Sequence, residues 1–351
     1  MLVGTYTDGE SKGIYIFRMD GASGRLSPSG YAPAVHPSFL AVHPTHPFVY
    51  AVGETNEFEG RRAGSVSAFA FDRASGRLER LNSAAVPGGT PCHLIVDARG
   101  RYVLVANYAG GNVAVLPVEA NGAVGEPVCV REHSGSSVNP ERQARPHPHA
   151  IYLDAENRFA FVPDLGIDRV AVYAFDENTG ELSAVDSLWA GLRPGAGPRH
   201  MAFHPELPYA YVINELDSTI TVFGYEAAGG RLTPVQTVST LPDGFAGENW
   251  PAEVLVHPSG AFVYGSNRGH DSIAAFRVDR GTGRLLPIGH APTQGKWPRN
   301  FAIDPSGRRL FAENQNSGTI VEFAIQPDGT LRPTGQVVSV PSPACIKFVP
   351  C

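Results

Sequence analysis

The sequence has 351 residues, of which 42% are hydrophobic and 18% are charged, a composition typical of a globular chain with a sizeable core. A formal net charge of -6 gives no electrostatic reason to bind nucleic acid or an anionic membrane surface. No apolar run approaches the ~20 residues that span a bilayer, and no basic leader precedes the first strand pattern, so we expect a cytoplasmic protein.

The first 30 residues predict three short strands. These are LVGTY, GIYIFRM and a last strand that follows Gly24. Each later unit of the chain has four strand patterns, so this first segment lacks one strand. We expect another part of the chain to supply it, because sheets need to avoid free edges.

From Pro37 onward, one short pattern recurs along the chain. Most copies begin with Pro, continue with alternating apolar residues, and end with His or Asp, often followed by Pro. A mean period of 51 residues is typical of propellers or solenoids. The copies are PSFLAVHP from Pro37, PCHLIVDA from Pro91, PHAIYLDA from Pro148, PRHMAFHP from Pro198, PAEVLVHP from Pro251, PRNFAIDP from Pro298 and PACIKFVP from Pro343.

Each unit repeats the same series of strands. The first strand is followed by an apolar strand such as FVYAVGE, an alternating strand such as SVSAFAFD, and a last strand that opens with Leu, as in GRLER. The chain ends with a lone first strand, ACIKFVP at residues 344–350, which would complete the N-terminal unit. The sequence therefore predicts an all-β fold in one domain, residues 1–351. It is a seven-bladed β-propeller with four antiparallel strands per blade, closed by the C-terminal strand.

Strand order also predicts which residues share a face of the disc. The start of the first strand and the end of the second strand of an antiparallel blade lie on one face. On the opposite face, His43, His204 and His257 occur in turn sequences, and we expect them to serve turn geometry. The first face gathers ionisable groups at one mouth of the channel, where a small-molecule site is expected. They include His93, His147, His149, Asp164, Arg199, His200, Glu215, Glu253 and Arg268.

Several long segments resemble the seven-bladed lactonase family. They are HSGSSVNPERQARPHPHAIYLDAENRFAFVPDLGIDRVAVYAF, PGAGPRHMAFHP, YVINELDSTITVF and SNRGHDSIAAF, and the likeness extends over essentially the whole chain. That family contains propeller-type 6-phosphogluconolactonases and a related fungal carboxy-muconate cyclase. The resemblance implies a carboxylic-ester hydrolase that opens a lactone.

The resemblance also implies which residues form the active site. A histidine of the PHxH segment, the arginine of GPRH, the glutamate of NELDS and the arginine of SNRG are the family's proposed catalytic groups. In this chain they are His149, Arg199, Glu215 and Arg268. We expect substrate contacts from His147, His200, Glu253, His93 and Asp164.

Opening a lactone with water requires a base, an oxyanion site and groups that hold the sugar. Our hypothesis is that Glu215, alone or with His149, is the general base. Arg199 or Arg268 would face the oxyanion, and the other arginine would hold a phosphate or carboxylate together with His200. No GxSxG motif indicates a covalent nucleophile. We expect no cofactor and no metal, with the PHPH histidines in hydrogen-bonding roles.

The expected partner is a small-molecule sugar lactone. The first choice is 6-phospho-D-glucono-1,5-lactone, which would place the protein in the pentose phosphate pathway. Two alternatives stay open. A muconate-type lactonizing cycloisomerase would use the same anion-binding groups but transfer a proton to carbon. A non-catalytic interaction platform is disfavoured by the absence of WD and GH repeats and by the clustering of polar residues at one mouth. The sequence does not indicate an oligomeric state.

Overall fold

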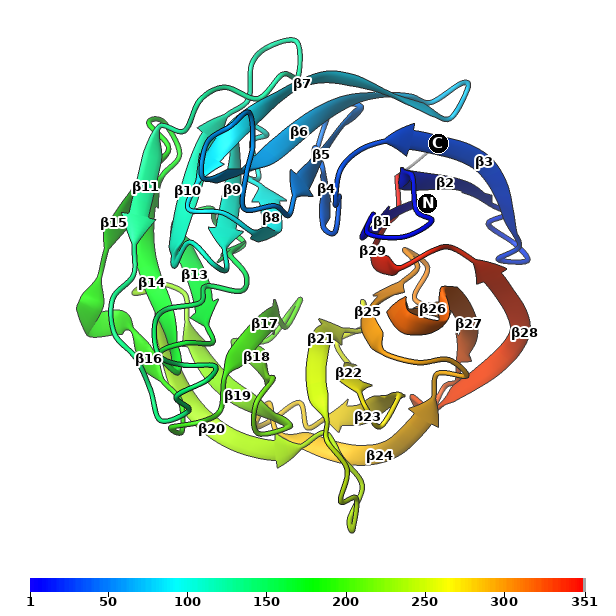
Figure 1. Cartoon of the computed structure of the whole chain (residues 1–351). Helices are drawn as coiled ribbons and strands as arrows, with labels where there is room; N and C mark the ends of the chain where they lie inside the picture. Colours follow the sequence, from blue (N-terminus) through cyan, green and yellow to red (C-terminus); the bar gives the residue numbers. More distant parts are fainter. Residues whose placement is uncertain (350–351) are drawn as a thin grey trace.

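The computed structural model describes residues 1–349, which form a ring of seven β-sheets around a central axis (Figure 1). Within this range, six sheets have four strands each, and one sheet has five. The prediction of a seven-bladed β-propeller is therefore confirmed.

The first three complete blades follow one another along the chain. Blade 1 contains β4 (Leu40–Val42), β5 (Phe48–Gly53), β6 (Ala63–Asp72) and β7 (Arg77–Pro87). Blade 2 contains β8 (Pro91–Val96), β9 (Tyr102–Asn107), β10 (Asn112–Pro117) and β11 (Cys129–Glu132). Blade 3 contains β12 (Tyr152–Leu153), β13 (Phe159–Asp164), β14 (Arg169–Asp176), β15 (Glu181–Ala184) and β16 (Ala190–Gly191).

Three further blades continue the same order. Blade 4 contains β17 (Pro198–Phe203), β18 (Tyr209–Asn214), β19 (Thr219–Glu226) and β20 (Arg231–Ser239). Blade 5 contains β21 (Trp250–Val256), β22 (Phe262–Arg268), β23 (Ser272–Val278) and β24 (Leu285–Pro292). Blade 6 contains β25 (Pro298–Ile303), β26 (Arg309–Asn314), β27 (Thr319–Ile325) and β28 (Leu331–Ser339).

Blade 7 joins the two ends of the described chain. Its strands are β29 (Pro343–Lys347), β1 (Leu2–Thr5), β2 (Gly13–Met19) and β3 (Leu26–Pro33), in that order. β1 pairs with β29 through Leu2 and Lys347, Val3 and Ile346, and Gly4 and Cys345. The expected ring closure is thus confirmed. Position 350, the last residue of the predicted closing strand, lies outside the described residues.

The apolar core lies between neighbouring blades, not on the axis. One cluster joins Leu104 and Val115 of blade 2 to Val162 and Tyr173 of blade 3, and similar clusters join the other blades. The middle strands are accordingly buried on both faces, as in β9, whose six residues are all buried. Because the blades pack against one another in this way, the axial channel is left for polar side chains.

A β-bulge at the start of the inner strand recurs in several blades. The register shifts between Pro91 and His93 in β8, between Pro198 and His200 in β17, and similarly in β21 and β25. A bulge re-aims the side chains next to it and often lies beside a functional site. It is the local feature that shapes the rim of the channel.

Helical structure in the described part of the chain is confined to two single turns of 3-10 helix. These are η1 (Asp186–Leu188) and η2 (Gln315–Ser317). In residues 1–349 there is no helix with the length and apolar character that a membrane crossing requires.

Candidate active site

Glu215 is the centre of a cluster of three arginines at the channel mouth. Its Oε2 accepts hydrogen bonds from Arg199 Nε at 3.1 Å and from Arg268 Nη2 at 2.7 Å, and its Oε1 accepts one from Arg142 Nη2 at 2.5 Å. The side chains of Glu215, Arg199 and Arg268 are at most 6% exposed. One carboxylate therefore neutralises only one of three neighbouring positive charges.

Burial alone would raise the pKa of Glu215, but the charges of Arg268, Arg199 and Arg142 outweigh burial and lower it to about 2. Glu215 is therefore ionised throughout the physiological pH range. A carboxylate with so low a pKa is a weak base, but it holds cationic groups in place well.

Glu215 and the three arginines around it come from different strands and loops. Arg199 is the bulge residue of β17, Glu215 directly follows β18, and Arg268 ends β22. Arg142 comes from the long segment between β11 and β12 and also bonds Tyr108 Oη at 3.3 Å. Strand order predicted a shared position for the first three. Arg142 was missed as a site residue, although it stands in the RQxxPHxH motif, because a loop has no strand register from which to place it.

Three buried histidines pack together near Arg199. The ring of His200 lies 5.4 Å from that of His149 and 5.3 Å from that of His93, between centroids. Burial, followed by nearby positive charge, lowers the pKa of His149 and His200 well below the usual value. Burial does the same to His93. All three rings are therefore neutral at pH 7, and a neutral imidazole can accept a proton.

Glu253 forms hydrogen bonds both to His200 and to Asn300 of the next blade. The Nδ1 atom of His200 is 3.0 Å from Glu253 Oε1, and the Nδ2 atom of Asn300 donates to Glu253 Oε2 at 2.6 Å. Burial raises the pKa of Glu253, although Lys347 and Arg199 oppose that rise. His200, Glu253 and Asn300 thus form one hydrogen-bonded chain across three blades.

His147 and Asp164 serve the scaffold of the site. His147 stacks on Tyr108 with ring centroids 4.4 Å apart, and its Nδ1 bonds the Tyr108 carbonyl at 2.9 Å. Asp164 is fully buried, where it bonds His133 Nδ1 at 2.6 Å and accepts from the His147 amide at 2.7 Å. These bonds orient the segment that carries His149. Asp164 therefore meets the predicted residue His147 at its backbone amide.

Arg299, which sequence reasoning overlooked, lines the same small cavity as Arg199. It is the bulge residue of β25, the position that Arg199 occupies in β17, and its guanidinium lies 5.1 Å from the centroid of the Tyr6 ring. Tyr6 Oη donates to Glu54 Oε2 at 2.7 Å, and Ser38 bonds the same oxygen. The shared Pro-Arg dipeptide of PRHMAFHP and PRNFAIDP was the signal that could have identified Arg299.

The mouth also contains a cysteine beside His149. Cys92 Sγ is 3.7 Å from His149 Nδ1 and 3.2 Å from the His149 carbonyl oxygen. Burial raises the pKa of Cys92, with Glu54 acting in the same direction, so the group is a thiol and not a reactive thiolate. Among residues 1–349, no three His, Cys, Asp or Glu side chains are placed to hold a metal ion.

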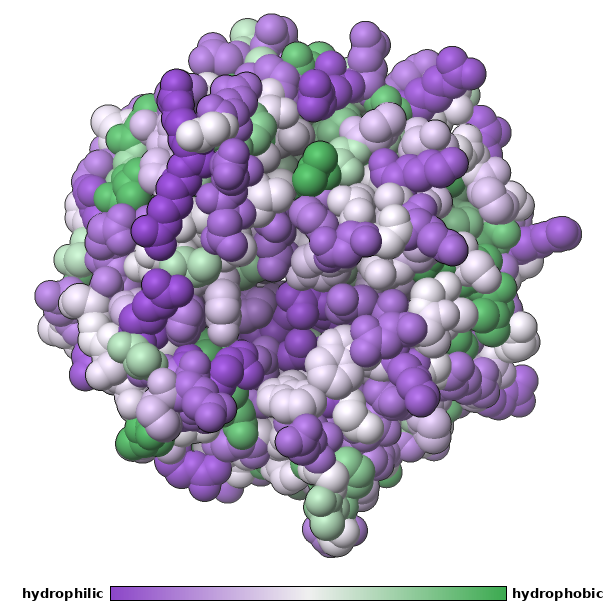
Figure 2. Space-filling model, in the orientation of Figure 1, coloured by the Kyte–Doolittle hydropathy of each residue, from purple (hydrophilic) through white to green (hydrophobic). Residues whose placement is uncertain are grey.

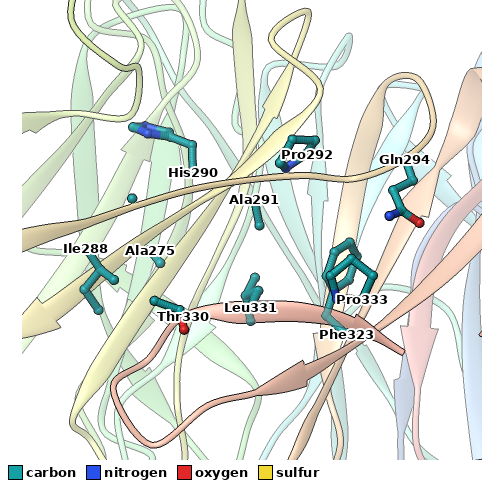
Figure 3. Close-up of a pocket in the computed structure, with 11 residues that line it drawn as sticks. Ala275, Ile288, His290, Ala291, Pro292, Gln294, Phe323, Thr330, Leu331 and Pro333 are labelled. Carbon is teal, nitrogen blue, oxygen red and sulfur yellow. The ribbon is translucent and has the colours of Figure 1, made fainter. Parts of the chain in front are cut away.

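The hollow at the centre of the disc is lined by hydrophilic residues (Figure 2). Cavities elsewhere have a different character. A cavity of about 300 Å³ between the outer strands of blades 5 and 6 has His290 as the one ionisable residue among those that line it (Figure 3). At the other end of the channel, a cavity of about 380 Å³ is bordered by Phe39, Tyr152 and Lys347 and reaches His93 and Glu253 of the candidate site, but no arginine lines it. Convergent arginines and histidines therefore distinguish the mouth as the candidate active site.

The histidines of the opposite face bridge neighbouring blades. Their Nε2 atoms lie 3.0 Å (His43), 2.9 Å (His204) and 2.7 Å (His257) from a glycine carbonyl oxygen of the next blade. They are thus turn residues, as expected, and they also join one blade to the next.

Comparisons with known proteins identify a family and several relatives that cover most or nearly all of the chain. The family model described as "Lactonase, 7-bladed beta-propeller" matches residues 1–348. A 6-phosphogluconolactonase of Bacillus subtilis is 38% identical over 349 residues, which cover 99% of this chain and 97% of the relative. One from Pectobacterium carotovorum is 34% identical over 288 residues, covering 81% of this chain and 80% of that protein. The solved structure of a periplasmic gluconolactonase from Pseudomonas aeruginosa superposes with a TM-score of 0.93 at 35% identity, covering 99% of this chain and 98% of that one.

Proposed function

The chain belongs to the seven-bladed β-propeller lactonase family, and we propose that its substrate is an anionic sugar δ-lactone, with 6-phospho-D-glucono-1,5-lactone as first choice. As a lactonase, the protein is a carboxylic-ester hydrolase. The relatives from Bacillus subtilis and Pectobacterium carotovorum are named for the phosphorylated lactone, which supports that choice. The product would then enter the pentose phosphate pathway, and we propose a cytoplasmic location to match.

The observation that carries this proposal is the excess of arginine at the mouth. Arg142, Arg199 and Arg268 share the single carboxylate of Glu215, and Arg299 forms no salt bridge within residues 1–349. Clustered buried cations are costly unless an anion joins them. Arginine forms bidentate hydrogen bonds with phosphate and carboxylate groups, so a phosphorylated substrate would match this excess of positive charge. We assign the phosphate to Arg299, the arginine that is least engaged by the protein.

The arginines beside Glu215 are suited to the lactone carbonyl. Arg199 and Arg268 are held by Glu215 and by backbone carbonyls of Ala252 and Trp250, so their orientation is set before substrate arrives. Pre-oriented donors that face a developing oxyanion are typically worth about 2.7–4 kcal/mol each. We propose that one of these two guanidiniums stabilises the tetrahedral intermediate.

The proton acceptor is better sought among the histidines than at Glu215. Both oxygens of Glu215 accept hydrogen bonds from guanidiniums and its pKa of about 2 makes it a weak base, whereas the neutral ring of His200 has a buried Nε2 with no hydrogen-bond partner within residues 1–349. In the reaction, water adds to the carbonyl carbon as its proton passes to an imidazole. The ring C–O bond then breaks, and the proton passes to the departing oxygen. The product is an acid that ionises and releases one proton to solvent.

A panel of phosphorylated and plain lactones tests the proposal by pH-stat titration of the released acid. We expect the phosphorylated δ-lactone to be opened with the highest kcat/KM after subtraction of spontaneous opening. In Arg299→Met, KM for the phosphorylated lactone should rise by about ten- to hundred-fold, as expected for the loss of a charge-assisted hydrogen bond, with little change for the plain lactone. Arg193→Met, which removes an exposed rim arginine paired with Asp217, is the matched control.

Two outcomes would contradict the proposal. If no lactone opens faster than in buffer, the hydrolase assignment for this chain is wrong. If Arg299→Met weakens both lactones equally, the phosphate is bound elsewhere. Reaction in oxygen-18 water separates hydrolysis from a cycloisomerase, since only hydrolysis must place the label in the acid product.

A further inference from the structure

We propose that His200 is the base that activates the attacking water, that Glu253 and Asn300 position it, and that a one-water cavity beside it is the nucleophile's site. This inference rests on the proposed hydrolysis and names the group that performs its proton transfer. The sequence-based hypothesis placed His200 and Glu253 among substrate contacts and the base at Glu215. The hydrogen bonds of the channel instead support His200 as the base and Glu253 as the residue that positions it.

The first observation is the arrangement around the imidazole. Nδ1 of His200 lies 3.0 Å from Glu253 Oε1, an oxygen that also accepts the Val254 amide at 2.9 Å. Glu253 Oε2 accepts from Asn300 at 2.6 Å. A carboxylate fixed at both oxygens holds the proton on Nδ1, which leaves the lone pair on Nε2. This is how a carboxylate orients a histidine base in hydrolases generally.

The second observation is that His200 Nε2 has no partner. The atom is buried, and it forms no hydrogen bond among residues 1–349, although nearly all buried polar atoms in proteins form one. An unpaired buried nitrogen on a ring whose other nitrogen is held by a carboxylate needs an explanation. Acceptance of a proton from a bound water supplies that explanation.

The third observation is a cavity of the right size. A space of about 10 Å³ is lined by nine residues that include His200, and this is close to the smallest volume that holds one water. A buried water needs two to four polar partners. His200, Arg199, Arg299, Asn300 and the Ser38 hydroxyl all contribute to its wall. A water there lies beside the imidazole and next to Arg199, which we propose to contact the substrate.

The protonation states are consistent with this role. Burial lowers the pKa of His200 well below its usual value, and Arg199 and Arg299 lower it further, so the ring is neutral before reaction. When the water attacks, its proton passes to Nε2, and Glu253 stabilises the resulting imidazolium. The same proton then passes to the ring oxygen that leaves the carbonyl carbon. No oxidant, metal or covalent enzyme intermediate is required.

The first experiment compares two buried histidines of the same strand sequence. His200→Gln should lower kcat for the lactone by about 10²- to 10⁴-fold, the usual contribution of a general base. His204 lies four residues further along, is 6% exposed and bridges blades through the Gly260 carbonyl. His204→Gln should therefore cost stability but change kcat by less than about three-fold, within the usual effect of a change remote from the chemistry.

The second experiment tests whether His200 accepts a proton in the reaction or only fills space in the channel. In His200→Gly, added imidazole should restore turnover at least about ten-fold above the imidazole-catalysed background, and His149→Gly should show no such rescue. As a positioning residue, Glu253 should act through the rate of the chemical step. Glu253→Gln should lower kcat with KM nearly unchanged, and Glu253→Asp should recover part of the loss.

The outcomes separate this inference from the proposed function. If the unmodified protein opens no lactone, the function is wrong. If it does open one, but folded His200→Gln keeps a kcat within about ten-fold, His200 is not the base. Rescue of His149→Gly in place of His200→Gly would likewise overturn the assignment and transfer the role to His149.

Discussion

Glu215 is a single carboxylate shared by three guanidinium groups, so its removal leaves three buried or half-buried cations without their shared ion-pair partner. Its side chain is 5% exposed, and two of its three partners are equally buried. Water therefore screens these charges poorly. The stability of the mouth and the affinity for anions that we propose would both follow from the same cluster.

We predict that Glu215→Gln lowers the free energy of unfolding by about 3–5 kcal/mol, the usual cost of leaving buried charges unpaired. Phosphate or sulfate should restore part of the lost Tm, because the anion can replace the carboxylate among the arginines. Thermal unfolding in sulfate and in chloride at equal ionic strength measures this. Glu206→Gln, which breaks an exposed pair with Arg280, is the control and should cost no more than about 1 kcal/mol without an anion effect.

Glu313 is a buried carboxyl outside the mouth, and its effect on stability depends on pH. Both of its oxygens are buried, and burial, reinforced by Glu253, raises its pKa well above the usual value, although the Ile346 backbone opposes that rise. The folded chain therefore keeps a proton that the unfolded chain releases above its ordinary pKa. A raised pKa of this kind supports folding at low pH, and that support is lost as pH rises.

We predict that Glu313→Met is more stable than the unmodified protein at pH 7.5 and that the difference shrinks toward pH 4.5. The gap should widen by up to about 1.4 kcal/mol per pH unit until the folded pKa is reached. Urea unfolding at pH 5.0 and 7.5 measures it. A gap that does not change with pH would show that Glu313 is ionised in the folded protein.

At the residue scale, sequence reasoning identified the types of side chain at the mouth but not their partners. It placed Arg199, Glu215 and Arg268 together because strand order alone determines their face. It could not show that Glu215 lies between guanidiniums, which lower its pKa, because side-chain direction depends on the bulge in β17. For the same reason, Arg299 was overlooked.

At the scale of the elements, contacts between blades repeat along the ring. The Tyr50 hydroxyl donates to the Gly122 carbonyl of the next blade at 3.1 Å, and the Tyr264 hydroxyl donates to that of Gly329 at 2.9 Å. His204 bonds Gly260 on the opposite face, and a Cβ at Gly260 would lie 2.4 Å from the His204 ring. Glycine at that turn therefore allows the close approach, and its φ of +71° also favours glycine.

We predict that His204→Ala lowers the free energy of unfolding by about 1–3 kcal/mol, because the change leaves buried polar groups of two blades unpaired. Chemical unfolding followed by tryptophan fluorescence measures this. His46→Ala removes an exposed histidine of a similar turn and should change stability by no more than about 0.5 kcal/mol. An equal loss in both variants would show that the bridge between blades contributes nothing specific.

The repeat predicted the strands well, and blade 3 shows where such prediction fails. β12 has only two residues, because the preceding segment forms an irregular path with an isolated bridge between Pro148 and Asp164. β16 then adds a fifth strand through Arg169 and Gly191. Hydrophobic alternation records which side chains are buried, but not which backbone groups remain unpaired. A strand of two residues, such as β16, is therefore too short to show the alternation of apolar and polar residues from which strands are predicted.

At the scale of the whole molecule, the ring depends on one pair of strands. β1 lies between β2 and β29, and both ends of the described chain meet in blade 7 (Figure 1). The sequence predicted this closure correctly, since an incomplete first unit and a lone last strand leave one way to avoid open edges. The sequence could not predict how blade 7 packs against its neighbours, because that depends on side chains from three blades.

We predict that removal of residues 343–351 abolishes cooperative unfolding and lactone hydrolysis, because β1 then has an unpaired edge and Cys345 and Ile346 leave the core. A matched permutant carries residues 341–349 in front of Met1 through a short turn and ends at residue 340. Since Lys347 already pairs with Leu2, this order needs only a hairpin connection. It should recover both properties, as followed by calorimetry and pH-stat. Failure of the permutant would show that closure requires more than the strand itself.

The pairing of Leu2–Thr5 with Pro343–Lys347 also determines when the ring can close during translation. The earliest strands leave the ribosome first, yet their partner is synthesised only after every intervening blade. At roughly 5–20 residues per second, the nascent chain carries an open sheet edge for on the order of half a minute. Such an edge invites pairing with other chains. In the cell, the N-terminal strands are therefore where chaperone binding to the emerging polypeptide would matter most.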